Sequence, residues 1–282
     1  PDAPAETLPG EADVLEAAVR GIRRLNERHP CPGGRRFFLV HRPRAWNPAE
    51  GVWMARERKR GKVADFNRLV TAGEVAPFVR VEAEVERLRT IRCVITLDAD
   101  TQLPPEAAWR LVGTLAHPLN RPRFDPATRC VVEGYGVLQP RLAPSLVGAH
   151  RSRLARLLSG EVGLDPYTRE VSDVFHDLCG QSSFVGKGIY DVHVFTRAVA
   201  GRFPANRILS HDHLEGGHAR CGFVSDVELV EGGPSRYLAE TGRRHRWFRG
   251  DWQIARWLAR TVPGADGRPV PNPLGGDRKS VV

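Results

Sequence analysis

Cysteine is scarce in this sequence, and no pattern joins the few that are present. The 282 residues include five cysteines, which lie far apart and form no C-x-x-C pair. An odd number at such wide spacing argues against a zinc ribbon and against a disulfide scaffold, and it favours a reducing compartment. The five are Cys31, Cys93, Cys130, Cys179 and Cys221.

Long apolar runs are also lacking. No stretch reaches the roughly 18 consecutive apolar residues of a membrane-spanning helix. The first residues, Pro1–Pro4, have no basic start followed by an apolar stretch, so they do not resemble a signal peptide. We therefore expect this segment itself to be soluble. The missing initiator Met suggests that it is a fragment.

Positive charge is abundant. Forty-two Lys and Arg residues against 33 Asp and Glu give a formal net charge of +9. Such a surplus suits nucleic acid, anionic lipid or a phosphorylated small molecule, and the total alone does not choose among them. The hydrophobic content of 41% supports a folded core, and no repeat period is present, which argues against disorder, collagen and solenoids.

Apolar segments alternate between strand-like and helix-like patterns along the chain. Short apolar strands followed by loops and amphipathic helices indicate an α/β sheet covered by helices on both faces. The patterns predict helices over residues 11–29, 63–72, 104–115, 145–158, 191–200, 211–220 and 243–258, and strands over residues 37–40, 91–97, 131–138 and 223–230.

Two carboxylates directly follow the predicted strand 91–97. Asp98 and Asp100 therefore lie at the carboxyl end of a strand, where ligands gather in α/β sheets. Carboxylate oxygens suit Mg²⁺ or Mn²⁺, and such an ion could neutralise a diphosphate as it leaves. A solvated acidic turn has the same spacing, so the triplet alone leaves both interpretations open.

A basic stretch opens the predicted helix at residue 63. Residues 56–62 form a loop that ends in Lys62, and Asn67 follows one turn later. Basic side chains at a loop-to-helix junction can hold phosphate together with the free N–H groups of the first turn. The alternative is an exposed basic loop with no ligand.

The segment His211-Asp212-His213 begins another predicted helix. An aspartate within reach of a sugar hydroxyl could act as a general base. A zinc site built from His211, His213 and His218 is a second possibility, although this spacing matches no standard zinc motif. A capped helix start with surface histidines is the structural alternative.

Arginine and tryptophan alternate over residues 243–253. Interleaved Arg and Trp can bind a diphosphate and stack on a sugar face, or on a base of single-stranded nucleic acid. A solvated arginine face over a tryptophan-filled core would give the same pattern. This cluster therefore decides nothing by itself.

The order of these clusters is more informative than any one of them. Gly61–Asn67, Leu97–Thr101, Ser210–Asp212 and Arg246–Trp247 follow one another along the chain. This order resembles the G-K, D-x-D, T-E-D and Q-x-x-R-W motifs of processive inverting glycosyltransferases of the GT-A type, such as cellulose and chitin synthases. Arg243 stands where that pattern has Gln, which puts the polar contact of this position with donor or acceptor in question.

A more specific resemblance covers nearly the whole chain. Several long blocks, in the same order, are similar to the glycosyltransferase domain of cyclic β-1,2-glucan synthases. The blocks are Trp53–Lys62, Ile95–Pro104, Ala116–Asn120, Gly163–Tyr167, Phe184–Asp191 and His245–Gln253.

The resemblance implies transfer of glucose from UDP-glucose to a growing β-1,2-glucan, with inversion. It implies that Asp98 and Asp100 hold Mg²⁺ or Mn²⁺ with the diphosphate, and that Asp212 takes the proton of the attacking hydroxyl. One in-line displacement needs no covalent enzyme nucleophile. The remaining implied residues are Lys62 and Asn67 on the nucleotide side, Arg246 and Arg249 beside the diphosphate, and Trp247 and Trp252 as the acceptor platform.

The resemblance also implies a larger protein. Members are inner-membrane proteins with this domain on the cytoplasmic face and a phosphorylase domain further on. We expect residues 1–264 to form a partial GT-A-like domain, a mixed sheet flanked by helices without its first strands. Residues 265–282 are expected to be a loop or tail, of which the last six read like translated sequencing adapter.

Two other functions remain open at this point. One is a basic module that binds single-stranded nucleic acid, although its acidic clusters would repel phosphates without a metal, so we expect no nucleic-acid partner. The other is a fragment that keeps the scaffold of the synthase but has no activity of its own.

Overall fold

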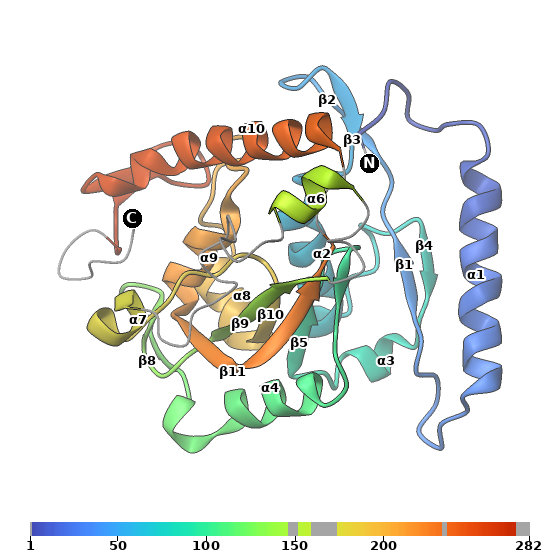
Figure 1. The fold of residues 1–282 in the computed structure, drawn as a ribbon, viewed down its shortest axis with the longest axis horizontal. Coiled ribbons are helices and arrows are strands. Elements are labelled where there is room, and N and C mark those ends of the chain that lie inside the picture. The colour runs from blue at the N-terminus through green and yellow to red at the C-terminus, as the bar shows by residue number, and fades with distance from the viewer. Residues whose placement is uncertain (1, 146–151, 159–173, 233–235, 275–282) are drawn as a thin grey trace. The chain divides into compact units, whose positions relative to one another are not determined.

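The computed structural model describes residues 2–145, 152–158, 174–232 and 236–274 (Figure 1). They form two compact units, which divide between Arg92 and Cys93. Both units mix helices and strands, so the predicted α/β class is confirmed. In the described ranges, no helix combines the length and the apolar character needed to cross a bilayer.

The first unit packs helices beside two small antiparallel sheets. Its core contains Leu69, Phe78 and Leu88, all buried. Strand β1 pairs with β4, and β2 forms a hairpin with β3. The elements are α1 (Glu11–Arg28), β1 (Leu39–His41), β2 (Ala45–Asn47), β3 (Val52–Met54), α2 (Arg58–Ala72), β4 (Arg80–Glu82) and α3 (Val85–Leu88).

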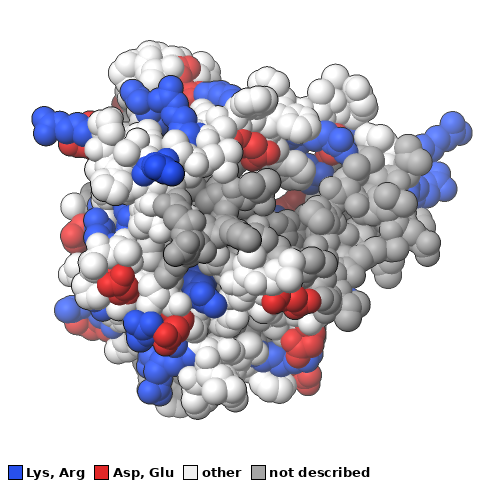
Figure 2. Space-filling view, turned by 90° about the vertical axis from the view of Figure 1, so that its left-hand side faces the viewer, with Lys and Arg blue, Asp and Glu red and all other residues white. Residues whose placement is uncertain are grey.

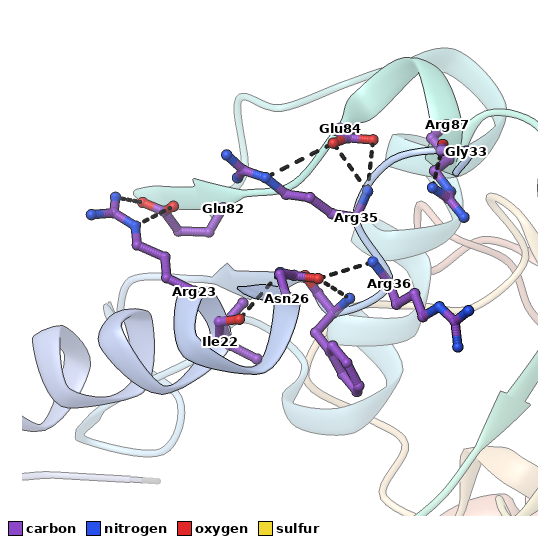
Figure 3. Close-up of polar contacts among 10 residues, drawn as sticks. Ile22, Arg23, Asn26, Gly33, Arg35, Arg36, Glu82, Glu84 and Arg87 are labelled. Atoms are coloured by element: carbon purple, nitrogen blue, oxygen red, sulfur yellow. Dashed lines mark hydrogen bonds and ion pairs between the residues drawn. The ribbon is translucent and has the colours of Figure 1, made fainter. Parts of the chain in front are cut away.

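One asparagine fastens the loop after α1 to that helix. The side-chain oxygen of Asn26 accepts hydrogen bonds from the backbone N–H groups of Arg36 and Phe37, at 2.9 and 3.0 Å (Figure 3). Its amide group donates to the carbonyl oxygens of Ile22 and Phe37. The polar side chain thus holds the chain in place as it approaches β1.

Helix α2 begins earlier than the sequence pattern indicates. The stretch from Arg58 to Lys62, predicted as loop, is helical. The guanidinium of Arg42 donates to the carbonyl oxygens of Arg56 and Arg58, at 3.1 and 2.8 Å, and to the buried carboxylate of Asp65. These long-range contacts anchor the start of the helix, and a local pattern contains no sign of them.

The second unit is built on a five-stranded mixed sheet in the order β5-β10-β9-β11-β6. Strand β11 runs parallel to β9, and the other three pairings are antiparallel. The predicted mixed sheet is therefore present. Its strands are β5 (Cys93–Thr96), β6 (Thr101–Gln102), β9 (Val137–Pro144), β10 (Gly188–Asp191) and β11 (Cys221–Glu231).

Helix α4 (Ala107–Ala116) covers one face of this sheet. Its buried Leu111 and Leu115 pack against residues of β9, β10 and β11, among them Leu138 and Ile189. Helices α8 (Val192–Val199) and α9 (His211–Ala219) pack on each other. These helices match the predicted ones closely, because their apolar spacing and flanking residues are local signals.

The other elements of the second unit surround this sheet. The predicted strand 131–138 divides into β8 and β9, because the chain turns at Gly134, which has a positive φ. Of the predicted helix 145–158, residues 146–151 lie outside the described residues. The elements are η1 (Pro118–Asn120), β7 (Arg123–Asp125), β8 (Cys130–Glu133), α6 (Arg153–Leu158), α7 (Val174–Cys179), α10 (Tyr237–Ile254), η3 (Ala255–Leu258), β12 (Thr261–Pro263) and β13 (Pro269–Pro271).

Part of the predicted tail is ordered. Strand β13 pairs with β12, and the side-chain amide of Asn272 donates to the carbonyl oxygens of Trp257 and Ala259 at 2.6 and 2.9 Å. Leu274 is buried against Gly217 of α9. Residues 275–282, including the suspected adapter sequence, lie outside the described residues, as does the block Gly163–Tyr167.

Candidate functional site

Three carboxylates meet where β5 ends. Asp98 and Asp100 lie in the turn between β5 and β6, which is closed by a hydrogen bond from the N–H of Thr101 to the carbonyl oxygen of Asp98. Strand β6 pairs with the end of β11, and Thr101 stands opposite Glu231. As a result, carboxylate oxygens of Asp98, Asp100 and Glu231 lie within 4.8 Å of one another.

Glu231 is not among the residues predicted from the sequence. It lies about 130 positions after the D-x-D triplet and carries no motif of its own. Only the pairing of β6 with β11 brings it to the turn. Three oxygen ligands at this spacing fit the preferences of Mg²⁺ and Mn²⁺, so the donor set is chemically suited to such an ion.

A lysine lies against the same group. The Nζ atom of Lys187 is 3.5 Å from Oδ2 of Asp98 and forms an ion pair with Glu231. Its side chain is 13% exposed. Lys187 immediately precedes β10, which pairs with β5, so the sheet itself brings the ammonium to the carboxylates.

Asp212 lies in the first turn of α9 beside a buried contact between His211 and Glu215. The Nδ1 atom of His211 is 2.9 Å from Oε2 of Glu215, one turn along the helix, and 3.4 Å from Oδ1 of Asp212. His211 and Glu215 are buried, whereas Asp212 is partly exposed. The pair therefore holds the start of α9 while the Asp212 carboxylate reaches the surface.

The Asp212 carboxylate lies directly over Gly186. Gly186 has a φ of +82°, and a Cβ atom there would be 2.6 Å from Oδ1 of Asp212. Glycine is therefore required both for the backbone conformation and for the close approach. Because Lys187 contacts Asp98 and Gly186 contacts Asp212, two consecutive residues lie between the D-x-D turn and the aspartate of α9.

Helix α10 is joined to the segment that precedes Asp212. Ser210 donates from Oγ to Oδ1 of Asp251 at 3.1 Å, and the N–H of Leu209 donates to Oε1 of Gln253 at 2.9 Å. Gly250 packs against Ser210. The segment 250–253 of the arginine- and tryptophan-rich block thus holds the residues before α9.

The expected substrate-binding residues of α10 are all exposed. Trp247 and Trp252 are 50% and 80% exposed, as a stacking platform requires. Arg246 and Arg249 lie on the same helix. Arg243, which stands where related motifs have Gln, places its guanidinium 4.7 Å from the Trp247 ring centre and forms an ion pair with Glu240.

The expected nucleotide-side residues and the alternative zinc site are the remaining predictions. Lys62 is exposed and Asn67 is buried, both on α2 of the first unit, whereas the three aspartates belong to the second unit. The alternative zinc site is not formed: His213 is exposed, and His218 points its Nδ1 atom to Sγ of Cys130, at 3.3 Å. His211 instead pairs with Glu215.

Comparison with known proteins adds a specific relationship. No protein-family model matches the chain. Over 258 residues, 91% of the chain, it is 46% identical to cyclic beta-(1,2)-glucan synthase NdvB of Rhizobium meliloti (strain 1021). The match spans 9% of that protein's length. The chain is therefore similar to one segment of that synthase, and the expected relationship to cyclic β-1,2-glucan synthases is supported.

Proposed function

We propose that this chain carries the glucosyl-transfer site of a cyclic β-1,2-glucan synthase. In this proposal, glucose passes from UDP-glucose to the growing β-1,2-glucan with inversion at the anomeric carbon, within a GT-A-like fold. One observation carries the proposal: the carboxylates of Asp98 and Asp212 contact two consecutive residues. Asp98 contacts Lys187, and Asp212 lies against Gly186. The relationship to the named synthase supports the choice of reaction.

The proposed chemistry needs a base on the acceptor side. Asp212 accepts the proton of the attacking hydroxyl, and the oxygen then forms a bond to the anomeric carbon as the bond to the diphosphate breaks. The buried His211–Glu215 pair fixes the helical turn that presents Asp212. A single in-line displacement with a positioned base requires no covalent intermediate.

The leaving diphosphate needs positive charge. Asp98 and Asp100, joined by Glu231, would hold Mg²⁺ or Mn²⁺, which supplies electrostatic stabilisation of the leaving group. In the proposal, Arg246 and Arg249 add positive charge beside the diphosphate. Trp247 and Trp252 offer flat apolar faces to the acceptor sugars.

The similarity to the glucan synthase also suggests where in the cell, and in what larger protein, the site acts. The chain would act as one part of a larger synthase, on the cytoplasmic face of the bacterial inner membrane, with membrane spans and a phosphorylase domain elsewhere in the protein. UDP-glucose and the β-1,2-glucan acceptor would be its partners. On the face shown in Figure 2, positive and negative side chains of the described residues are interspersed, and this pattern favours a small ligand over a long nucleic acid.

Calorimetry and a transfer assay test the proposal. The chain is expected to bind UDP only with Mn²⁺ or Mg²⁺ present, and Asp100→Asn should abolish that binding. Asp212→Asn should leave UDP binding unchanged and lower glucose transfer from UDP-glucose by about 10³-fold, within the usual range for loss of a general base. Asp266→Asn, in the exposed turn between β12 and β13, is the matched control.

Unchanged transfer by Asp212→Asn would rule out its role as the base. Metal-independent binding of single-stranded nucleic acid, weakening steeply with salt, would instead favour the nucleic-acid module. Failure of the folded chain to bind UDP with either ion would favour the inactive scaffold.

A further inference from the structure

Lys187 is a largely buried lysine whose partners are distant in the sequence. Its side chain is largely buried, and its ammonium contacts two of the three clustered carboxylates, Asp98 and Glu231. A buried ammonium is retained only where opposite charge offsets the loss of its hydration. The carboxylates thus supply the environment that Lys187 needs, and Lys187 supplies a cation that they need.

The charges of this group have a simple sum. Asp98, Asp100 and Glu231 together carry about −3 when ionised, and Lys187 brings this to about −2. A divalent ion would make the group neutral. Without Lys187, the same ion would leave about −1, which repels a diphosphate.

We propose that Lys187 is a resident cation of the Asp98–Asp100–Glu231 cluster, which weakens the binding of a divalent ion and keeps the loaded cluster neutral towards a diphosphate. This inference rests on the proposed function, since it takes the cluster as the metal site. Lys187 thereby sets a balance between two ligands: its charge opposes the metal and favours the nucleotide. A lysine that served only to pack the sheet would affect neither affinity through its charge.

Lys187→Met tests the charge while keeping an unbranched apolar side chain. Titration of the chain with Mn²⁺ alone, followed by calorimetry and electron paramagnetic resonance, is expected to show about tenfold tighter binding in this variant, because a nearby positive charge is lost. At saturating Mn²⁺, UDP should bind about tenfold more weakly. Lys187→Arg keeps the charge and should stay within about threefold of the original chain in both titrations.

A second variant changes a carboxylate of the cluster instead of the lysine. Glu231→Gln removes one carboxylate, and it should weaken Mn²⁺ binding about tenfold. Thermal unfolding of each variant shows whether it is folded, and Glu231→Gln supplies the test if Lys187→Met is not.

The outcomes separate this inference from the proposed function. If the original chain binds Mn²⁺ and Lys187→Met binds it equally or more weakly, the resident-cation role is wrong and the metal site stands. Unchanged UDP affinity in Lys187→Met, or unchanged Mn²⁺ affinity in Glu231→Gln, would also overturn the inference. Binding of Mn²⁺ by neither the original chain nor Lys187→Met would overturn the metal site and the inference together.

Discussion

Gly250 of α10 lies against Ser210, two residues before Asp212. A Cβ atom at position 250 would overlap Oγ of Ser210 and lie 3.0 Å from its backbone nitrogen. The neighbouring hydrogen bonds from Ser210 to Asp251 and from Leu209 to Gln253 hold the two segments at this distance. The close approach of a glycine therefore sets where α9 begins.

Gly250→Ala should separate these segments. Overpacking of a close contact costs about 1–3 kcal/mol of stability, and we expect glucose transfer to fall about tenfold because Asp212 shifts with α9. Thermal unfolding and the transfer assay measure the two effects. Ser210→Gly removes the overlapping side chain and should restore part of the activity in the double variant.

Gly242→Ala, in the same helix, is the matched control for this change. A Cβ atom there meets nothing within 4 Å. Alanine in an open helical position stabilises by about 0.5–1 kcal/mol relative to glycine. Equal behaviour of the two variants would contradict the positioning role of Gly250.

Gly186→Ala should displace the Asp212 carboxylate. The substitution introduces strain at a φ of +82° and places Cβ 2.6 Å from Oδ1 of Asp212. We expect transfer to fall at least about tenfold, whereas Mn²⁺-dependent binding of UDP is retained, because only the proposed base moves. Calorimetry and the transfer rate together separate these effects.

Gly201→Ala shares the strain without the contact, since φ is +65° and nothing lies within 4 Å of the added atom. This variant should lose about 1–2 kcal/mol of stability, and its rate of glucose transfer should stay unchanged. If both variants lose transfer equally, backbone strain alone accounts for the effect, and the Asp212 contact does not matter.

Asp65 should be essential to the stability of the first unit. Its buried carboxylate forms ion pairs with Arg42 at 2.7 Å, with Arg56 at 2.9 Å, and with Arg68. Asp65→Asn leaves the buried Arg42 without its counter-charge, and the loss expected for breaking a buried pair is about 3–5 kcal/mol. Chemical unfolding measures it.

Glu86→Gln provides the comparison for that loss. Glu86 is 91% exposed and lies 3.9 Å from Arg89, so its removal should change stability by less than about 1 kcal/mol. A similar small loss for Asp65→Asn would show that the arginine cluster does not depend on the carboxylate.

Cys31 should react as a thiolate near neutral pH. The N–H of Gly33, with Arg87 and Arg36, lowers the pKa of its thiol from 9.0 to about 7. The guanidinium of Arg87 also donates to the carbonyl oxygen of Gly33, as Figure 3 shows. Since the thiolate is the reactive form, alkylation should accelerate as pH rises, with a midpoint near 7.

Mass spectrometry of the Cys31 peptide after brief iodoacetamide treatment gives this midpoint. Arg87→Ala removes one donor to Sγ, at 3.7 Å, so the midpoint should move to higher pH. Arg89→Ala, two residues further along the chain, should leave the midpoint in place. A midpoint insensitive to Arg87 would contradict this account of the low pKa.

Local patterns predicted several elements of the second unit but missed others, among them strand β10, which pairs with both β5 and β9. Apolar spacing located the strand that ends at Asp98 and the helices at 107–116 and 192–199, because burial selects side chains at the period of each element. The early start of α2 was missed, since the contacts from Arg42 that support it come from outside the segment.

By itself, the sequence determined which chemical groups this protein has and which elements carry them: a D-x-D after a strand, an aspartate at a helix start, and a helix of arginine and tryptophan. Only the tertiary structure decided which of these groups meet. Glu231 and Lys187 reach Asp98 because β11 pairs with β6, and β10 with β5. Such neighbours depend on strand pairings between residues about 90 to 130 positions apart, and no local preference of the chain encodes those pairings.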